Sequence, residues 1–327
     1  MNNLAIDETQ TIRTEATVLR EREEILDGLL ATQKRISPKF FYDQRGSEIF
    51  DRICELPEYY VTRTELEIMR RHLPEAAKRI GPGAAIIEFG AGSSLKVRML
   101  LEHLEDPAAY VPVEISGDYL LEQAQELARD FPELSIQPVT ADFTKAFDLP
   151  RHPVEPRRNL VFFPGSTIGN FTRPKALELL EVMREEAKPG GALLIGVDLE
   201  KDPAVLEAAY NDASGVTAEF NMNLLRRLNA EHEADFDLDA FRHKAVYDES
   251  ECRIEMRLIS TQAQTVHFAG REIAFRENEY IITEYSHKYS IPRFLELARR
   301  AGFEPEACWT DDDELFSLHY MTVPRTA

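Results

Sequence analysis

The stretch AAIIEFGAGSSLKVRMLLEHL, residues 84–104, determines the fold that the sequence predicts. Its first six residues are an apolar run of the length of a buried strand, and GAGSS after them is a glycine-rich turn. From residue 95 onward, apolar side chains recur at helical spacing. A buried strand that passes through a glycine turn into a helix is typical of a βαβ unit, so the stretch predicts a parallel sheet.

The same alternation continues towards the C-terminus as far as residue 199. Short apolar runs predict four more strands, at residues 109–115, 134–143, 159–165 and 192–199. Helical spacing predicts helices at residues 117–131 and 174–191. Strands that alternate with helices in this way predict a parallel sheet with helices on both of its faces.

The last part of the chain returns to this sheet after an interruption. Residues 291–303 have helical spacing, and two stretches with strand character follow, at residues 304–310 and 316–323. The expected fold is therefore α/β, with a Rossmann-like, mostly parallel sheet whose last strand is antiparallel. We assign residues 65–199 and 290–327 to this sheet domain.

A second, α+β domain is expected to comprise residues 10–64 and 200–289. It begins with an amphipathic helix near residues 14–34, and an aromatic cluster follows, with Phe40, Phe41, Tyr42, Phe50, Tyr59 and Tyr60. Residues 202–231 have a helical pattern. An antiparallel meander is then predicted from three stretches of alternating polarity, 253–260, 264–275 and 279–290. The aromatic cluster fits a hydrophobic core or, because tyrosines add hydroxyls, a small-molecule pocket.

Composition excludes several classes of partner. The chain has 327 residues, 58 acidic and 38 basic, and its net charge of −20 repels phosphate backbones. No apolar run approaches the roughly 20 residues that cross a bilayer, and the polar N-terminus lacks the apolar core of a signal peptide. We therefore expect a cytoplasmic protein without nucleic-acid or membrane partners, and a monomer.

Metal and hydrolase motifs are incomplete. The three cysteines are far apart, and the eight histidines lack the HExxH spacing of a zinc site. The acidic loop 235–239 begins like a calcium loop, but Ala240 replaces the turn glycine and Val246 the closing glutamate. Gly165 and Ser166 lack the GxSxG context of a hydrolase nucleophile. We expect no metal.

Candidate ligand-binding residues follow the carboxyl ends of the predicted parallel strands, where open parallel sheets bind ligands. The turn after the first strand contains Gly90 and Gly92, but Leu95 stands where the dinucleotide fingerprint GxGxxG requires glycine. Glu114 ends the next strand, where a carboxylate can accept hydrogen bonds from ribose hydroxyls. The sequence therefore favours a nucleoside ligand other than a dinucleotide.

The next two strands end in residues that suit an adenine. Asp142 can accept from the amino group of the base while the Phe143 ring packs on it, and the fourth strand ends in the polar turn GSTIGN, residues 165–170. Each residue alone could lie in a solvated loop, but together they favour an adenosine without pyrophosphate, as in S-adenosylmethionine. A closing antiparallel strand is also a habit of methyltransferases that use this cofactor, which is an analogy of fold.

Several motifs resemble those of histidine-specific, S-adenosylmethionine-dependent methyltransferases, which make trimethylhistidine (hercynine) on the way to ergothioneine. The motifs are FFYDQRGSEIFDRICELPEYYVTRTE (40–65), IIEFGAGSSLKVRMLL (86–101), GSTIGNF (165–171), AYNDASGVTAEFN (209–221), IEM (254–256) and TEYSHK (283–288). The similarity extends from about residue 37 to the C-terminus, and GSTIGN and LPEYY are specific to this superfamily. It implies an enzyme that transfers three methyl groups to the α-amino group of L-histidine.

The resemblance also implies roles for individual residues. The cofactor site would comprise Gly90, Lys96, Glu114, Asp142 and Phe143, and the domain of residues 65–199 and 290–327 would hold it. Glu114 stands where some relatives have aspartate, and either carboxylate can hold the ribose. The backbone of the amino-acid substrate would be bound by Asn170 and Tyr210, with Gly165 and Thr167 in the same turn as Asn170. The imidazole would be surrounded by Tyr59, Met256, Glu284 and Ser286. Tyr42 would lie near the transfer point, and Tyr42 and Asn170 would orient the amine.

Alternation within the predicted strands supports the imidazole assignment. Residues 282, 284, 286 and 288 are expected to share one face of their strand, and residues 254, 256 and 258 one face of theirs. A carboxylate and a hydroxyl on one face suit a ring with two nitrogens, and a methionine can fill the space beside it. A position of Glu284 on a solvent-exposed face is the alternative.

Three other functions remain open at this point. Relatives methylate the amino group of prenylated tryptophan, although that substrate would need a less polar pocket than Glu284 and Ser286 provide. A binding protein that senses S-adenosylmethionine without catalysis would not need a second-substrate pocket. A nicotinamide-dependent dehydrogenase is disfavoured by Leu95.

Overall fold

The computed structural model describes residues 15–115, 117–145, 147–152 and 154–325 and divides the chain into two compact units. The described part of unit 1 lies within Val61–Glu200 and Lys288–Ala327, and that of unit 2 within Ile12–Tyr60 and Lys201–His287. Residues 10–14, 116, 146, 153 and 326–327 of the expected domains lie outside the described residues.

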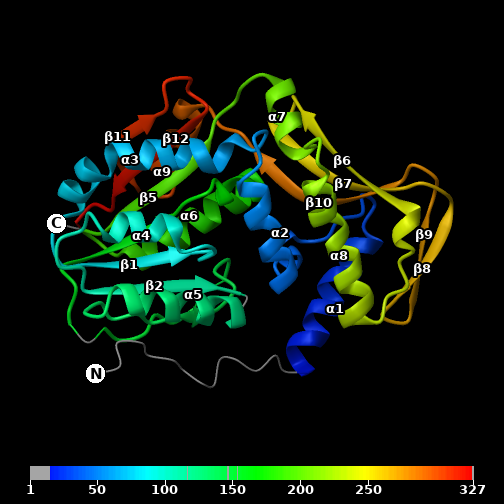
Figure 1. The fold of residues 1–327 in the computed structure, drawn as a ribbon, viewed down its shortest axis with the longest axis horizontal. Coiled ribbons are helices and arrows are strands. Elements are labelled where there is room, and N and C mark those ends of the chain that lie inside the picture. The colour runs from blue at the N-terminus through cyan, green and yellow to red at the C-terminus, as the bar shows by residue number, and fades with distance from the viewer. Residues whose placement is uncertain (1–14, 116, 146, 153, 326–327) are drawn as a thin grey trace. The chain divides into compact units, whose positions relative to one another are not determined.

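Unit 1 is built on a seven-stranded sheet with the order β11-β12-β5-β4-β1-β2-β3 (Figure 1). The strands are β1 (Ala84–Phe89), β2 (Ala109–Glu114), β3 (Val139–Thr140), β4 (Arg158–Phe163), β5 (Ala192–Asp198), β11 (Glu304–Thr310) and β12 (Phe316–Thr322). Strands β1 to β5 pair in parallel, whereas β12 is antiparallel to both β5 and β11. All six residues of β1 are buried, as expected for a parallel strand covered on both faces. The predicted α/β fold class with an antiparallel last strand is confirmed.

Helices cover both faces of this sheet. On one face, α6 (Arg173–Ala187) and α9 (Ile291–Arg300) form a hydrophobic core with strand residues such as Phe163. On the other face lie α3 (Tyr60–Ile80) and α5 (Gly117–Asp130), while α4 (Leu95–Leu101) follows the glycine turn after β1. Helix α3 was not predicted from the sequence. Its 21 residues bring Glu65 against the sheet, which becomes important for the functional site.

The third predicted strand is much shorter than expected. Residues 134–143 were predicted to be extended throughout, but only Val139–Thr140 form a strand, and Ile136 makes an isolated bridge to Tyr110. Pro138 separates the two pieces. Proline has no backbone N–H to donate, so it interrupts the ladder at this point.

Unit 2 contains a three-stranded antiparallel sheet with the order β10-β7-β6. Its strands are β6 (Phe241–Asp248), β7 (Arg253–Ser260) and β10 (Tyr280–His287). Its helices are α1 (Glu15–Leu30), α2 (Gln44–Cys54), α7 (Pro203–Tyr210) and α8 (Val216–His232), with short 3-10 helices at Pro38–Phe41 and Leu238–Ala240.

The predicted meander is wrong in one of its three members. Residues 264–275 form a separate two-stranded hairpin, β8 (Gln264–Phe268) and β9 (Arg271–Phe275), and the third strand of the sheet is β6. Strand β6 escaped prediction because its sequence, FRHKAVYD, buries only Phe241 and Ala245. A strand with so few buried apolar residues lacks the period-two signal.

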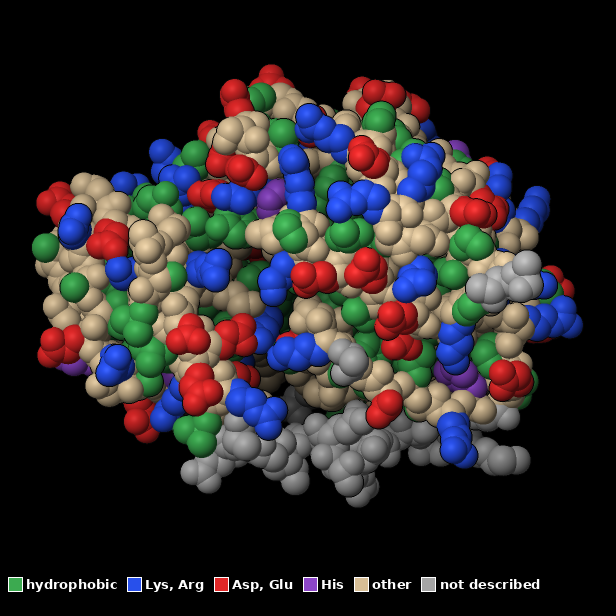
Figure 2. Space-filling view, turned by 180° about the vertical axis from the view of Figure 1, so that it is seen from behind, with side chains coloured by type: hydrophobic (Ala, Val, Ile, Leu, Met, Phe, Trp, Pro, Cys, Tyr) green, Lys and Arg blue, Asp and Glu red, His purple; other side chains and the backbone are tan. Residues whose placement is uncertain are grey.

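Charged side chains are frequent on the surface, as expected for a chain with 58 acidic and 38 basic residues. Figure 2 shows acidic and basic side chains interspersed over the face that it draws. Within the described ranges, no helix combines the length and the apolar character that crossing a membrane requires. The three cysteines are free thiols, and Cys308 is exposed.

Candidate functional site

Gly90 and Phe143 lie against each other at the carboxyl end of β1. Gly90 has a φ of +69°, and a β-carbon added to it would lie 3.4 Å from Cε1 of Phe143. The Phe143 ring also packs on Phe89 and Phe163, with centroid distances of 5.7 and 5.9 Å. A positive φ and a close aromatic neighbour both favour glycine at this position. At Gly90 the turn therefore presents backbone without a side chain beside an aromatic ring.

The two predicted carboxylates, Glu114 and Asp142, follow neighbouring strands of unit 1. Glu114 pairs with Thr140 in the β2–β3 register, and its backbone oxygen accepts from Ala141 N at 3.0 Å. The Asp142 carboxylate accepts from the backbone N and the hydroxyl of Thr144, and Lys145 lies 3.0 Å from it. Both carboxylates are half-buried. The structure thus places the two acids at or just after the ends of adjacent strands, β2 and β3.

Lys96 is joined to the polar turn after β4 through Glu65, which was not predicted from the sequence. Glu65, on α3, is fully buried; its carboxylate lies 2.6 Å from Lys96 Nζ and accepts from Gly165 N at 2.9 Å. A β-carbon on Gly196 of β5 would lie only 2.1 Å from Glu65 Oε1. Glycine at position 196 therefore allows a carboxylate to approach the sheet and connect two predicted ligand-binding segments.

The turn at residues 165–170 has an unusual backbone. Gly165 and Ser166 have φ values of +81° and +58°, and Thr167–Asn170 then form a 3-10 helix. The Ser166 hydroxyl accepts from Asp198 N at 2.9 Å, while the Thr167 hydroxyl donates to Pro164 O at 3.2 Å. The turn is therefore held from both sides, with Thr167 and Asn170 half-buried.

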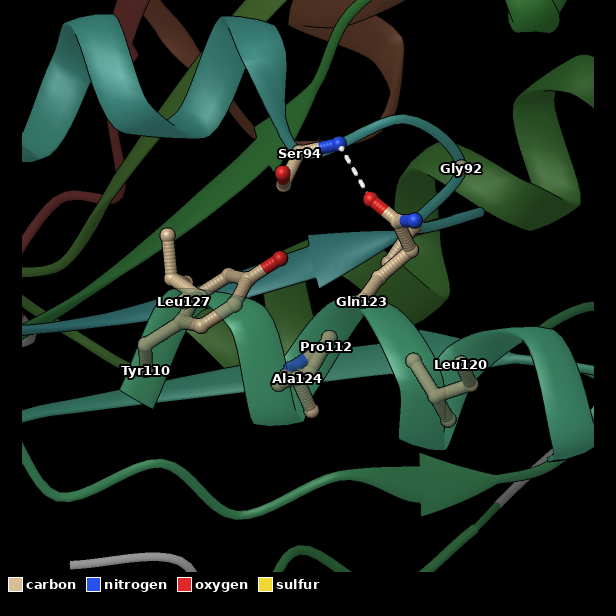
Figure 3. A pocket seen from close by; sticks show the side chains of 9 residues that line it. Gly92, Ser94, Tyr110, Pro112, Leu120, Gln123, Ala124 and Leu127 are labelled. Carbon is tan, nitrogen blue, oxygen red and sulfur yellow. Dashed lines mark hydrogen bonds between the residues drawn. The ribbon is translucent and has the colours of Figure 1, made fainter. Parts of the chain in front are cut away.

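Glu88, the fifth residue of β1, is another buried acid of unit 1. Tyr110 donates a hydrogen bond of 2.5 Å to its carboxylate, and both side chains are buried. Burial raises the pKa of Glu88 to about 7, although the Tyr110 hydrogen bond and the Lys96 charge oppose this shift. Tyr110 also lines a small pocket between α5 and the glycine turn, where Gln123 accepts from Ser94 N (Figure 3).

The raised pKa predicts a pH-dependent stability. The folded protein binds the Glu88 proton more tightly than the unfolded protein does. Protonated Glu88 therefore contributes to the stability of the fold below pH 4.5, and this contribution is lost as the pH rises through about 7. At higher pH the wild type must bury a charged carboxylate, a cost that Glu88→Gln removes. The variant should therefore be more stable than the wild type at pH 8, and the difference in the free energy of unfolding should shrink at pH 5. Denaturant unfolding of unliganded protein measures it, with exposed Glu102→Gln as the control. An equal difference at both pH values would contradict the prediction.

Tyr59, Tyr210 and Ser286 form a buried cluster in unit 2. The rings of Tyr59 and Tyr210 lie 5.9 Å apart, and the Tyr210 hydroxyl donates to Ser286 Oγ at 2.8 Å. The pKa of Tyr59 is raised well above 10, and burial is the largest cause. Smaller upward contributions to this pKa come from Tyr210, Cys54, Glu284 and Tyr42. Tyr59 therefore keeps its proton at physiological pH. Glu284 and Tyr42 lie close enough to Tyr59 to affect its pKa.

Tyr42 belongs to an aromatic cluster beside this site. Its ring lies 5.8 Å from Phe50 and 5.9 Å from Phe220, and Phe50 lies 6.4 Å from Tyr59. Tyr42 itself is half-buried, whereas Tyr59 is 7% exposed. The aromatic stretch therefore contributes to the hydrophobic core and also supports the tyrosines of the candidate site.

Met256 and Glu284 face each other across β7 and β10, but the alternation predicted for β10 is wrong at two positions. Glu284 pairs with Met256 and Ser286 with Ile254, so these side chains share a face. Ile282 pairs with Arg257 and lies on the opposite face, because the register shifts between Ile282 and Glu284. A β-bulge at this point reverses the alternation.

The second wrong position is Lys288. It lies beyond the end of β10, in unit 1, and its ammonium is fully buried. It makes an ion pair of 2.6 Å with Asp198, which is equally buried. Lys288 therefore does not belong to the face that carries Glu284.

Several residues that shape these sites were not predicted. Glu65, Glu88, Asn221 and Thr283 all lie within the motifs that carry the family resemblance, which is the signal that could have found them. His243, whose ring bonds to Asn221 and to the Tyr210 backbone, lies in no such motif. Among the described residues, no group of three or more histidine, cysteine or acidic side chains is arranged to hold a metal ion.

Comparisons with known proteins agree on one family. A family model described as histidine-specific, S-adenosylmethionine-dependent methyltransferase matches residues 21–323. The histidine N-alpha-methyltransferase of Mycolicibacterium smegmatis is 39% identical over 302 residues, which cover 91% of this chain and 93% of that protein.

Fungal relatives are more distant. Ergothioneine biosynthesis protein 1 of Neurospora crassa is 32% identical over 89% of this chain, and the match covers 33% of that protein. The 4-dimethylallyltryptophan N-methyltransferase of Claviceps purpurea is 28% identical over 58% of each chain.

Proposed function

Because the chain belongs to the family of histidine-specific, S-adenosylmethionine-dependent methyltransferases, we propose that it trimethylates the α-amino group of L-histidine. The product would be trimethylhistidine (hercynine), in ergothioneine biosynthesis. The observation that carries the choice of histidine is the polar set within unit 2, where Glu284 faces Met256 beside the Tyr59–Tyr210–Ser286 cluster. The cytoplasmic location and the monomeric state expected from the sequence remain predictions.

The residues of unit 1 fit S-adenosylmethionine. Gly90 has no side chain to cover the neighbouring Phe143 ring, on which an adenine can pack. The half-buried Glu114 can accept hydrogen bonds from both ribose hydroxyls, and Asp142 can accept from the adenine amino group. Lys96, held by Glu65, offers a cation to the cofactor's carboxylate. When bound, S-adenosylmethionine supplies an electrophilic methyl group on a sulfonium.

The residues of unit 2 fit an imidazole. Glu284 can accept from one ring N–H, and the neutral hydroxyl of Tyr59 can donate to the other ring nitrogen. Met256, 2% exposed, fills space on the same face as Glu284. Both ring nitrogens of histidine thus have possible partners, whereas an indole has one N–H and would leave polar groups unpaired. This difference favours histidine over a tryptophan derivative.

The chain's task in the reaction is to hold a neutral amine in line with the methyl group. A terminal amine has a pKa of roughly 8, and burial next to a positive charge lowers it. No strong general base is then required, and catalysis rests on orientation. Asn170 and Tyr42 are assigned to orienting the amine, Tyr210 to the amino-acid backbone, and Gly165 and Thr167 to the turn that carries Asn170.

Mass spectrometry tests this function directly. The protein with S-adenosylmethionine and each amino acid in turn should yield histidine that has gained one to three methyl groups. Methylation of another amino acid in place of histidine would refute the substrate assignment. Binding of S-adenosylmethionine without formation of S-adenosylhomocysteine would instead indicate a sensor.

A further inference from the structure

Asn221, on α8, contacts all three strands of the unit 2 sheet through one side chain. Its amide donates to His243 Nδ1 on β6 at 2.8 Å and to Arg257 O on β7 at 3.2 Å. Its carbonyl oxygen accepts from the Thr283 hydroxyl on β10 at 2.7 Å. Asn221 is fully buried, so these bonds are shielded from competing water.

Thr283 is the extra residue of the β-bulge in β10. Ile282 pairs with Arg257 and Glu284 with Met256, so Thr283 has no partner of its own in the register. Its hydroxyl donates to Asn221 and is 3.1 Å from Met256 O. The bulge is therefore held by side-chain hydrogen bonds as well as by the ladder.

The bulge decides which face carries the proposed histidine-binding residues. Thr283 points to α8, and regular alternation after it would turn Glu284 to the other face. That other face carries Glu255, whose carboxylate binds Arg253 and Arg257. With the bulge, Glu284 and Ser286 lie on the α8 side of the sheet. On this same face their cross-strand partners are Met256 and Ile254.

A second series of hydrogen bonds connects Asn221 to β10, through His243 and Tyr210. Because His243 Nδ1 accepts from Asn221, its Nε2 carries the proton and donates to Tyr210 O at 2.8 Å. Burial lowers the pKa of His243, which favours this neutral form. The Tyr210 hydroxyl then donates to Ser286. Asn221 thus connects to the candidate site both through the bulge and through the Tyr210 side.

We propose that Asn221, acting through Thr283 and His243, is a positioning residue that sets the acceptor amino-acid site. It keeps Glu284 and Ser286 on the binding face and holds Tyr210 beside them. Asn221 itself makes no contact with substrate in this assignment. The inference rests on the proposed histidine methylation.

Thr283→Val tests the proposal with little change in shape, because valine keeps the β-branch and lacks the hydroxyl. The KM for histidine should rise about fivefold to tenfold, the range for loss of one buried hydrogen bond, while the KM for S-adenosylmethionine stays within twofold. Thr283→Ser keeps the hydroxyl and should restore the histidine KM. Thr265→Val, at an exposed position of β8, is the matched control. An unchanged histidine KM, or equal changes for both ligands, would overturn the proposal.

A double-mutant cycle separates positioning from general destabilisation. If Thr283 acts by placing Glu284, the effect of Thr283→Val on histidine binding should shrink in a Glu284→Ala background. The full effect in that background would overturn the proposal. Should Thr283→Val fail to fold, Thr283→Ala in the same cycle gives the same comparison. If the wild type methylates another amino acid, the proposed function fails, and the same cycle with that acceptor still tests whether the Thr283–Asn221 hydrogen bond positions Glu284.

Discussion

Glu65→Ala is expected to lower the free energy of unfolding by about 3 kcal/mol and to weaken S-adenosylmethionine binding at least about tenfold. The substitution leaves the half-buried Lys96 ammonium without its partner at 2.6 Å and Gly165 N without its acceptor at 2.9 Å. Both groups belong to segments assigned to ligand binding, so their loss of position should be measurable as a change in affinity. Denaturant unfolding and titration calorimetry with S-adenosylmethionine provide the two measurements.

Glu67 supplies a matched control on the same helix. It is exposed and pairs with Arg71 one turn away, an arrangement that contributes at most about 0.5 kcal/mol. Glu67→Ala should therefore leave stability and cofactor affinity nearly unchanged. Glu65→Gln keeps an oxygen for Gly165 N but loses the charge, and should fall between Glu65→Ala and the wild type. If Glu65→Ala behaves like Glu67→Ala, the buried pair does not organise the cofactor site.

The parallel sheet could be predicted because its strands are buried on both faces. Strand β1 lies at the predicted residues 84–89, and β5 lies within the predicted 192–199; every residue of both strands is buried. The predicted strands were wrong where something other than apolar burial determines the backbone conformation. Pro138 shortens the third strand, and β6 buries too few apolar residues to produce a periodic signal.

The candidate site shows the same division. Carboxylates at strand ends could be found from sequence because the fold brings such ends together. Glu65 does not end a strand, and its role depends on a close approach to Gly196 on a strand more than a hundred residues away. Only its place in a motif of the family resemblance could have pointed to it. The β-bulge at Thr283 could not be predicted. Simple alternation grouped Ile282 with Glu284, and only the register shows that they lie on opposite faces.

Glu284→Ala is expected to weaken histidine binding by 30-fold or more, on the order of 2–3 kcal/mol, because it removes a charged hydrogen-bond acceptor from the proposed imidazole site. Glu284 lies in the electrostatic surroundings of Tyr59 and faces Met256. Affinity for S-adenosylmethionine should stay within about twofold. Separate calorimetric titrations with histidine and with the cofactor measure the two effects.

Two comparisons make this prediction specific to the imidazole. Glu277→Ala changes an exposed acid of the same unit by the same net charge, so it should leave histidine affinity unchanged. With Glu284→Ala, analogues in which a non-polar ring replaces imidazole should lose far less affinity than histidine, because they never used the carboxylate. An equal loss for histidine, its non-polar analogues and the cofactor would mean that Glu284 supports the fold of unit 2 and does not recognise the ring.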